Sequence, residues 1–197
     1  MKEYPWGTDF QGVQYLMLHQ NQSMPYIRHA ELFDDGRFIV SCQSVQQSRL
    51  LMHATELHAD KTFSRTRCRE FEINSYDPVS RRIVTLARIY MDHEDEWGYY
   101  QAFKSVFDQA EKDMGYGIPF GHLTPNDEAS PTGTRLKAIL VDEHGGQMKG
   151  LNRYFQSKYP NDDKQYHILR IVKTCQVHYN RTIEDLERGI HPQSHKG

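Results

Sequence analysis

The order of extended and helical segments constrains the fold of this chain more than any other feature of its sequence. Apolar and β-branched residues alternate or cluster in three successive segments, 51–59, 69–76 and 82–90, as expected for strands. Beyond residue 94 the apolar residues recur every three or four positions, which is the period of an amphipathic helix. Three strands followed by alternating helices and strands predict a mixed sheet flanked by helices.

The second half of the chain alternates between the two kinds of segment. A helix is predicted over 94–114, and the proline- and glycine-rich stretch 118–134 is expected to form a loop. The remaining predicted elements are a strand at 136–141, a helix at 147–159, a fifth strand at 166–172 and a helix at 176–188. The expected fold is therefore α/β, with a five-stranded mixed sheet and the element order β-β-β-α-β-α-β-α.

A length of 197 residues fits one domain with small extensions, and 38% hydrophobic residues can supply a core. Residues 1–37 are mixed in character and are expected to form an N-terminal extension. The main domain is expected over 38–189, and residues 190–197 form a polar tail.

The composition argues against several classes of protein. The mean hydropathy is -0.77 and no apolar run approaches the ~18 residues of a membrane span, so no membrane segment is expected. No apolar stretch resembling a secretory signal opens the chain, and three cysteines do not suggest a disulfide framework, which favours a reducing, intracellular compartment. A net charge of -2 argues against strong free-standing DNA affinity, though not against DNA as a substrate.

Two aspartates stand where predicted strands end. Asp60 follows the segment 51–59, and Asp142 follows 136–141. If the two strands are neighbours, the carboxylates form a site for a divalent cation, and Mg²⁺ held by carboxylate oxygens is central to phosphoryl transfer. Aspartate is also common in turns and at helix N-termini, so strand-end caps without a metal are the alternative interpretation.

Four segments resemble the catalytic core of a MULE-type (Mutator-like) DDE transposase of diverged fungal type. Residues 57–63 (LHADKTF) are similar to the family's strand with its first aspartate, and 139–145 (ILVDEHG) to the strand with its second. Residues 92–107 resemble its acidic and then aromatic helix, and 175–181 (CQVHYNR) its Cys-x-x-His signature.

This resemblance implies a ribonuclease H-like fold, with which the predicted element order agrees. In such a fold the first and fourth strands lie side by side, so that Asp60 and Asp142 meet. The resemblance further implies binding of Mg²⁺ or Mn²⁺, cleavage and joining of DNA strands, DNA as the partner and a nuclear location. Assembly into a homo-oligomer is left open.

The family also has a third acidic residue, which follows a helical insertion beyond the Cys-x-x-His signature. The chain ends too early to hold this insertion, so activity is uncertain from the sequence. If the insertion is absent, a residue of the last predicted helix is expected to be the third acid, with Glu184, Asp185 and Glu187 as the candidates. Otherwise the chain is a fragment, or a derivative that has lost catalysis.

Two further groups of residues are candidates for binding. Cys175 and His178 are three residues apart and could share a Zn²⁺, but structural zinc needs four ligands, and a buried cysteine with a surface histidine is an equal alternative. A basic stretch beside Asp60 could contact the phosphate backbone or simply be a solvated hairpin, and its members are Lys61, Arg65, Arg67 and Arg69.

Three functional interpretations follow from these observations. The first is a transposase-derived, Mg²⁺-dependent enzyme that cleaves and transfers DNA strands. The second is a catalytically inactive transposase remnant that binds DNA or protein, or an effector-like binder. The third is a metal-free α/β hydrolase-like or structural domain, although the sequence lacks a nucleophile elbow.

Overall fold

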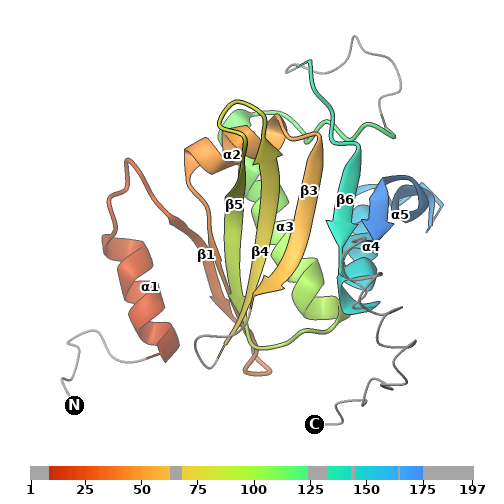
Figure 1. Cartoon of the computed structure of the whole chain (residues 1–197). Coiled ribbons are helices and arrows are strands. Elements are labelled where there is room, and N and C mark those ends of the chain that lie inside the picture. The colour runs from red at the N-terminus through yellow and green to blue at the C-terminus, as the bar shows by residue number, and fades with distance from the viewer. Residues whose placement is uncertain (1–8, 63–67, 124–132, 143–144, 164, 175–197) are drawn as a thin grey trace, which may run out of the picture.

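A computed structural model describes residues 9–62, 68–123, 133–142, 145–163 and 165–174, which form a seven-stranded mixed sheet with helices (Figure 1). The sheet order is β1-β2-β5-β4-β3-β6-β7. Neighbours from β1 to β3 pair antiparallel, whereas β6 pairs parallel with both β3 and β7. The strands are β1 (Ile27–Leu32), β2 (Phe38–Cys42), β3 (Glu56–Thr62), β4 (Arg69–Asp77), β5 (Arg82–Met91), β6 (Ala138–Val141) and β7 (Val172–Thr174). The helices are α1 (Asp9–His19), α2 (Val45–Met52), α3 (Glu96–Met114), α4 (Gly145–Lys158) and α5 (Tyr166–Ile171).

The α/β class and the mixed sheet are confirmed, but the predicted number of five strands is wrong. The additional strands are the hairpin of β1 and β2, and β2 pairs antiparallel with β5. In β1 the sequence IRHAEL has no clear alternation of apolar and polar residues, so its local pattern does not mark a strand. Its place in the sheet comes from pairing with β2, whose last four residues are all buried.

The strand predicted at 166–172 is also wrong, because residues 166–171 form the helix α5 and only Val172–Thr174 form a strand, β7. The two buried residues of α5, His167 and Ile171, are four positions apart, which is the spacing of one helix face. A short apolar run of this kind fits either element by periodicity, and tertiary packing decides between them.

The ends of α2 and α3 follow from recognisable caps. Ser44 and Gln47 form a capping box before α2, which places residues 51–52 in this helix rather than in the strand predicted at 51–59. Asp95 caps the N-terminus of α3, and Gly115 ends the helix with a left-handed φ of 78° that favours glycine.

The core lies between the sheet and the helices, and in the view of Figure 1 α3 runs behind the strands. Phe71 on β4 meets Tyr99 and Phe103 on α3 edge to face, with ring centroids 5.1 and 5.5 Å apart. Leu57 and Ala59 of β3 belong to the same buried cluster. The helix-covered face of β3 is therefore fixed, and the side chains between these residues point to the other face. No helix in the described part of the chain is long and apolar enough to cross a membrane.

The contact between α3 and α4 depends on a glycine. A Cβ atom at Gly150 would lie 2.5 Å from Tyr99 Cβ and 2.6 Å from the backbone nitrogen of Tyr100. The two helix backbones therefore approach more closely than any side chain at this position allows, and this approach holds the start of α4 against α3.

Replacing Gly150 by alanine is expected to lower the free energy of unfolding by about 1–3 kcal/mol, because the added methyl group overpacks the helix contact. Gly145→Ala on the same helix is the matched control, since nothing lies within 4 Å of a Cβ there. Urea denaturation of both variants measures the difference. Equal stabilities of the two variants would contradict the close approach.

Candidate functional site

Asp60 and Asp142 lie at neighbouring positions on the paired strands β3 and β6 or directly beyond them. β3 and β6 pair parallel, with the register running from Glu56↔Ala138 to Ala59↔Val141. Asp60 and Asp142 are the next residues after the last registered pair: Asp142 directly follows β6, as predicted, whereas Asp60 lies within β3, which continues to Thr62 instead of ending at residue 59. This confirms the predicted adjacency of the two strands and places Asp60 and Asp142 at corresponding positions along them.

Asp60 lies on the face of β3 that the helices do not cover. It is exposed, and its Oδ1 accepts a hydrogen bond of 2.8 Å from the backbone N–H of Lys61. Its antiparallel partner on β4 is Glu72, so a second carboxylate stands beside it on the open face. Like charges directly opposite each other destabilise a strand pair, which makes this position a natural one for a cation.

A positive charge already balances part of this open face. Arg88 on β5 is paired in register with Glu72, and its Nε lies 2.9 Å from Glu72 Oε1 and 3.7 Å from Glu70 Oε1. Tyr90 donates to Glu70 at 3.3 Å, and burial, together with this carboxylate, raises the pKa of Tyr90 to about 12. Glu70 and Glu72 therefore have side-chain partners, whereas within the described residues the Asp60 carboxylate accepts a hydrogen bond only from the backbone of its neighbour Lys61.

Asp142 is half-buried and directly follows β6. Its backbone N–H donates to Gln147 Oε1 at 3.1 Å, and Gln147 is fully buried. Burial raises the pKa of the Tyr99 hydroxyl. The contact between Tyr99 and Gln147 lowers this pKa, and the negative charges of Glu94 and Asp142 raise it. Tyr99 is therefore protonated at neutral pH, and it presents a neutral hydroxyl near Asp142 rather than a second negative charge.

The donor atoms at this edge suit a hard divalent cation, because both are carboxylate oxygens and Mg²⁺ retains several water ligands. Within the described residues no three His, Cys, Asp or Glu side chains gather as a metal site. A third protein ligand would have to come from elsewhere in the chain. The candidates Glu184 and Glu187 lie outside the described residues, as do the zinc candidates Cys175 and His178.

The basic stretch beside Asp60 is only partly described. Lys61 Nζ lies 2.9 Å from Glu94 Oε2, and Arg69 Nε lies 3.6 Å from Glu94 Oε1. Both cations thus have an internal carboxylate partner, while Arg65 and Arg67 lie outside the described residues. Contact of this stretch with a phosphate backbone stays a prediction.

Several residues of this region were not singled out from the sequence. Glu72 stands beside Asp60 only because of the β3–β4 register, although the alternation of 69–76 already places Glu70 and Glu72 on one face. Gln147 and Tyr99 have no local signal, since their position near Asp142 depends on how α3 packs against α4.

Cys42 is an inert thiol on the buried β2, because burial raises its pKa to about 11.

Comparison of the chain with protein-family models, with curated proteins and with solved structures found no match. The geometry of the sheet edge is therefore the basis on which a function for this chain is inferred.

Proposed function

We propose that the chain is a ribonuclease H-like domain that performs divalent-metal-dependent phosphodiester chemistry on DNA, as the resemblance to MULE-type transposases suggests. The observation that supports this most is the parallel register of β3 and β6, which brings Asp60 and Asp142 to one edge. The order β5-β4-β3-β6-β7 also agrees, because the third, second, first, fourth and fifth core strands follow one another as in that fold. A nuclear location belongs to the same proposal.

In this function Asp60 and Asp142 hold Mg²⁺ or Mn²⁺ through carboxylate oxygens, and the bound ion supplies Lewis-acid stabilisation of the phosphoryl oxygens. The exposure of Asp60 leaves its carboxylate open to a substrate that approaches the uncovered face of the sheet. Asp142 is half-buried, and its charge and that of Glu94 both act on the Tyr99 hydroxyl, whereas Asp60 is exposed and has Glu72 as its strand partner.

A non-catalytic form of the same domain is favoured by a different observation. The carboxylates next to Asp60 on the open face are ion-paired with Arg88, and the described cations that flank Asp60 are ion-paired with Glu94. These internal pairs stabilise the fold instead of contacting a metal or phosphate. Such stabilising ion pairs are expected in a transposase remnant that binds DNA or protein without cleaving DNA.

Binding of Mn²⁺ tests the proposed site directly. The chain is expected to bind Mn²⁺, and Asp60→Asn or Asp142→Asn is expected to weaken binding at least about tenfold, which corresponds to about 1.4 kcal/mol. Asparagine keeps the shape and removes the charge. Asp34→Asn, at an exposed turn, is the matched control and is expected to bind as the wild type does.

The free Mn²⁺ concentration is read from its electron paramagnetic resonance signal during a titration. If Asp60→Asn and Asp142→Asn bind Mn²⁺ as tightly as Asp34→Asn does, the two aspartates do not form the metal site.

A further inference from the structure

Two histidines and an aspartate form a chain at the end of the molecule opposite to Asp60 and Asp142. His167 Nε2 on α5 lies 3.0 Å from Asp162 Oδ2, and His167 Nδ1 lies 2.8 Å from His122 Nε2. His122 belongs to the segment after α3, whose residue Gly121 donates to the carbonyl oxygen of Leu136 at 2.8 Å. The three side chains therefore join segments that are far apart in the sequence.

Aromatic rings hold the central histidine of this chain in one orientation. His167 is 2% exposed, and its ring stacks on Phe155 with a centroid separation of 4.8 Å and an interplanar angle of 13°. Tyr159 and Tyr166 pack against other parts of the same ring. The ring cannot turn without losing these contacts, so Nδ1 stays beside His122 and Nε2 stays beside Asp162.

The carboxylate of Asp162 determines which nitrogens are protonated. The negative charge of Asp162, 3.0 Å from His167 Nε2, favours the proton on this nitrogen although no well-directed hydrogen bond joins the two among the described residues, so the neutral ring accepts at Nδ1. His122 must then donate through Nε2–H, which leaves its Nδ1 as an acceptor. This Nδ1 is buried, and it has no hydrogen-bond partner among the residues that the structure describes. A buried acceptor without a donor costs free energy unless a ligand or water satisfies it.

His122 lines a pocket of about 360 Å³ that also has positive charge. Its other lining residues are Gly121, Arg135, Lys137 and Arg170. Lys137 and Arg170 are exposed, and neither is ion-paired to a carboxylate in the part of the chain that the structure describes. The guanidinium of Arg170 lies over the ring of Tyr166, 3.8 Å from its centroid, which fixes its position at the rim.

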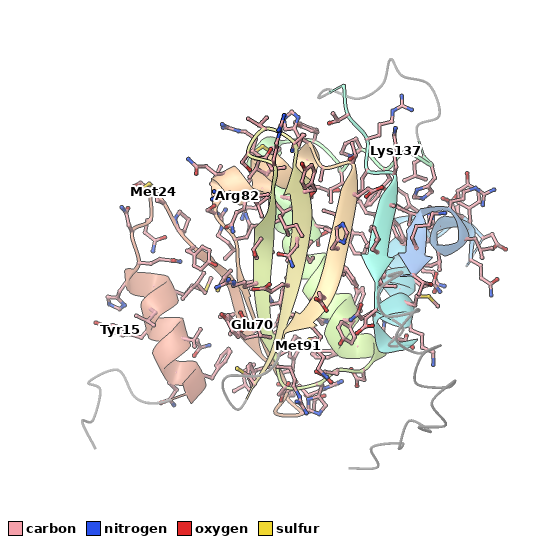
Figure 2. The ribbon with its side chains drawn as sticks, in the orientation of Figure 1. Tyr15, Met24, Glu70, Arg82, Met91 and Lys137 are labelled. Atoms are coloured by element: carbon pink, nitrogen blue, oxygen red, sulfur yellow. The ribbon has the colours of Figure 1, made fainter. Side chains whose placement is uncertain are left out.

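The pocket lies away from the aspartates. Lys137 directly precedes β6, whereas Asp142 directly follows it, and Figure 2 shows Lys137 at the far end of the sheet from Glu70. A ligand in this pocket would therefore occupy a site separate from the proposed metal site.

We propose that this pocket binds a protonated phosphate group, with Lys137 and Arg170 attracting its negative charge and His122 Nδ1 accepting its P–O–H proton. A protonated phosphate group matches the pocket both in charge and in the direction of its hydrogen bonds. A singly protonated phosphate offers an anion and a donor together, whereas a sulfate group offers only acceptors. The volume leaves room for a small substituent, so phosphomonoesters and inorganic phosphate both have the required chemistry.

Burial and the neighbouring charges together keep His122 neutral and able to accept. Burial, followed by the charges of His167 and Arg170, lowers the pKa of His122 to about 4 against the opposing effect of Asp162. Arg135 and Lys137, which line the same pocket, are also positive. At about pH 6, where a phosphomonoester is partly singly protonated, the ring is neutral and a sulfate finds no donor on Nδ1.

Methyl phosphate and methyl sulfate are the matched probes, because at about pH 6 the singly protonated phosphate and the sulfate have the same charge and similar shape. We expect methyl phosphate to bind at least about tenfold more tightly than methyl sulfate, the cost of one mismatched hydrogen bond. Titrations followed by the NMR signals of the His122 and His167 rings give both dissociation constants. Inorganic phosphate, as a third probe, distinguishes a site for free phosphate from one for an ester.

Variants test separately the attraction of the negative charge by Lys137 and Arg170 and the hydrogen bond accepted by His122. Lys137→Gln and Arg170→Gln are each expected to weaken methyl phosphate binding about fivefold. Arg82→Gln, at an exposed position of β5 outside the pocket, is expected to have no effect. His122→Gln is expected to abolish the preference for phosphate, because an amide can donate as well as accept.

Three results would overturn the proposal: no binding of methyl phosphate, equal affinity for methyl phosphate and methyl sulfate in the unaltered chain, or binding unchanged by both Lys137→Gln and Arg170→Gln. Since Lys137 and Arg170 are exposed, their variants decide the matter even if His122→Gln fails to fold. Loss of Mn²⁺ binding in Asp60→Asn leaves these results unaffected, so the two proposals fail independently.

Discussion

Asp113→Ala is expected to lower the free energy of unfolding by about 3 kcal/mol or more, because it leaves a buried cation without its partner. The Asp113 carboxylate on α3 is 6% exposed and lies 2.5 Å from Arg28 of β1, which is 10% exposed. Ser48 of α2 and Gln109 donate to the same carboxylate at 2.6 and 2.8 Å. One side chain thus joins the edge strand to two helices.

Asp108→Ala is the matched control on the same helix. Asp108 pairs with Lys104 one turn away, but both side chains are more than 40% exposed, so the loss is expected to be about 0.5 kcal/mol. Urea denaturation of both variants gives the comparison. Similar losses for Asp113→Ala and Asp108→Ala would mean that the buried pair does not hold β1 in place.

A second variant separates the ion pair from the packing around it. Combining Asp113→Leu with Arg28→Met removes both charges and fills the space with apolar groups, so stability should recover much of the loss seen in Asp113→Ala. If the double variant is as unstable as the single one, the missing hydrogen bonds to Ser48 and Gln109 are the larger part of the effect.

The central part of the fold could be predicted because its signals are local. The alternation in 69–76 and the helical period after residue 94 identify β4 and α3. The neighbouring positions of Asp60 and Asp142 follow from the parallel pairing of β3 and β6, although β3 continues beyond Asp60 to Thr62. These features depend on sequence spacing and on general rules of sheet topology.

The remaining features depend on contacts between distant segments. The edge strand β1 lacks strand periodicity and is held by its pairing with β2 and by the Arg28–Asp113 pair. The position of Glu72 beside Asp60 requires the register of a hairpin whose connection lies partly outside the described residues. The contact of His122 with His167 spans 45 residues, and no periodic pattern indicates it.

Asp60→Asn and Asp142→Asn are expected to lower the rate of metal-dependent DNA nicking at least about 100-fold. A metal ion stabilises the transition state of phosphoryl transfer by several kcal/mol, and each 1.36 kcal/mol changes a rate about tenfold. Both variants should keep the stability of the unaltered chain, because Asp60 is exposed and asparagine has nearly the same shape. Asp34→Asn, at the exposed turn before β2, should nick at the unaltered rate.

The most direct measurement of this account is the conversion of supercoiled plasmid to the nicked form by the purified chain with Mg²⁺ or Mn²⁺. We predict metal-dependent nicking by the unaltered chain and by Asp34→Asn, and a loss of at least about 100-fold in Asp60→Asn and Asp142→Asn. An unaltered chain that does not nick DNA with either metal, or aspartate variants that nick as fast as Asp34→Asn, would contradict the proposed function.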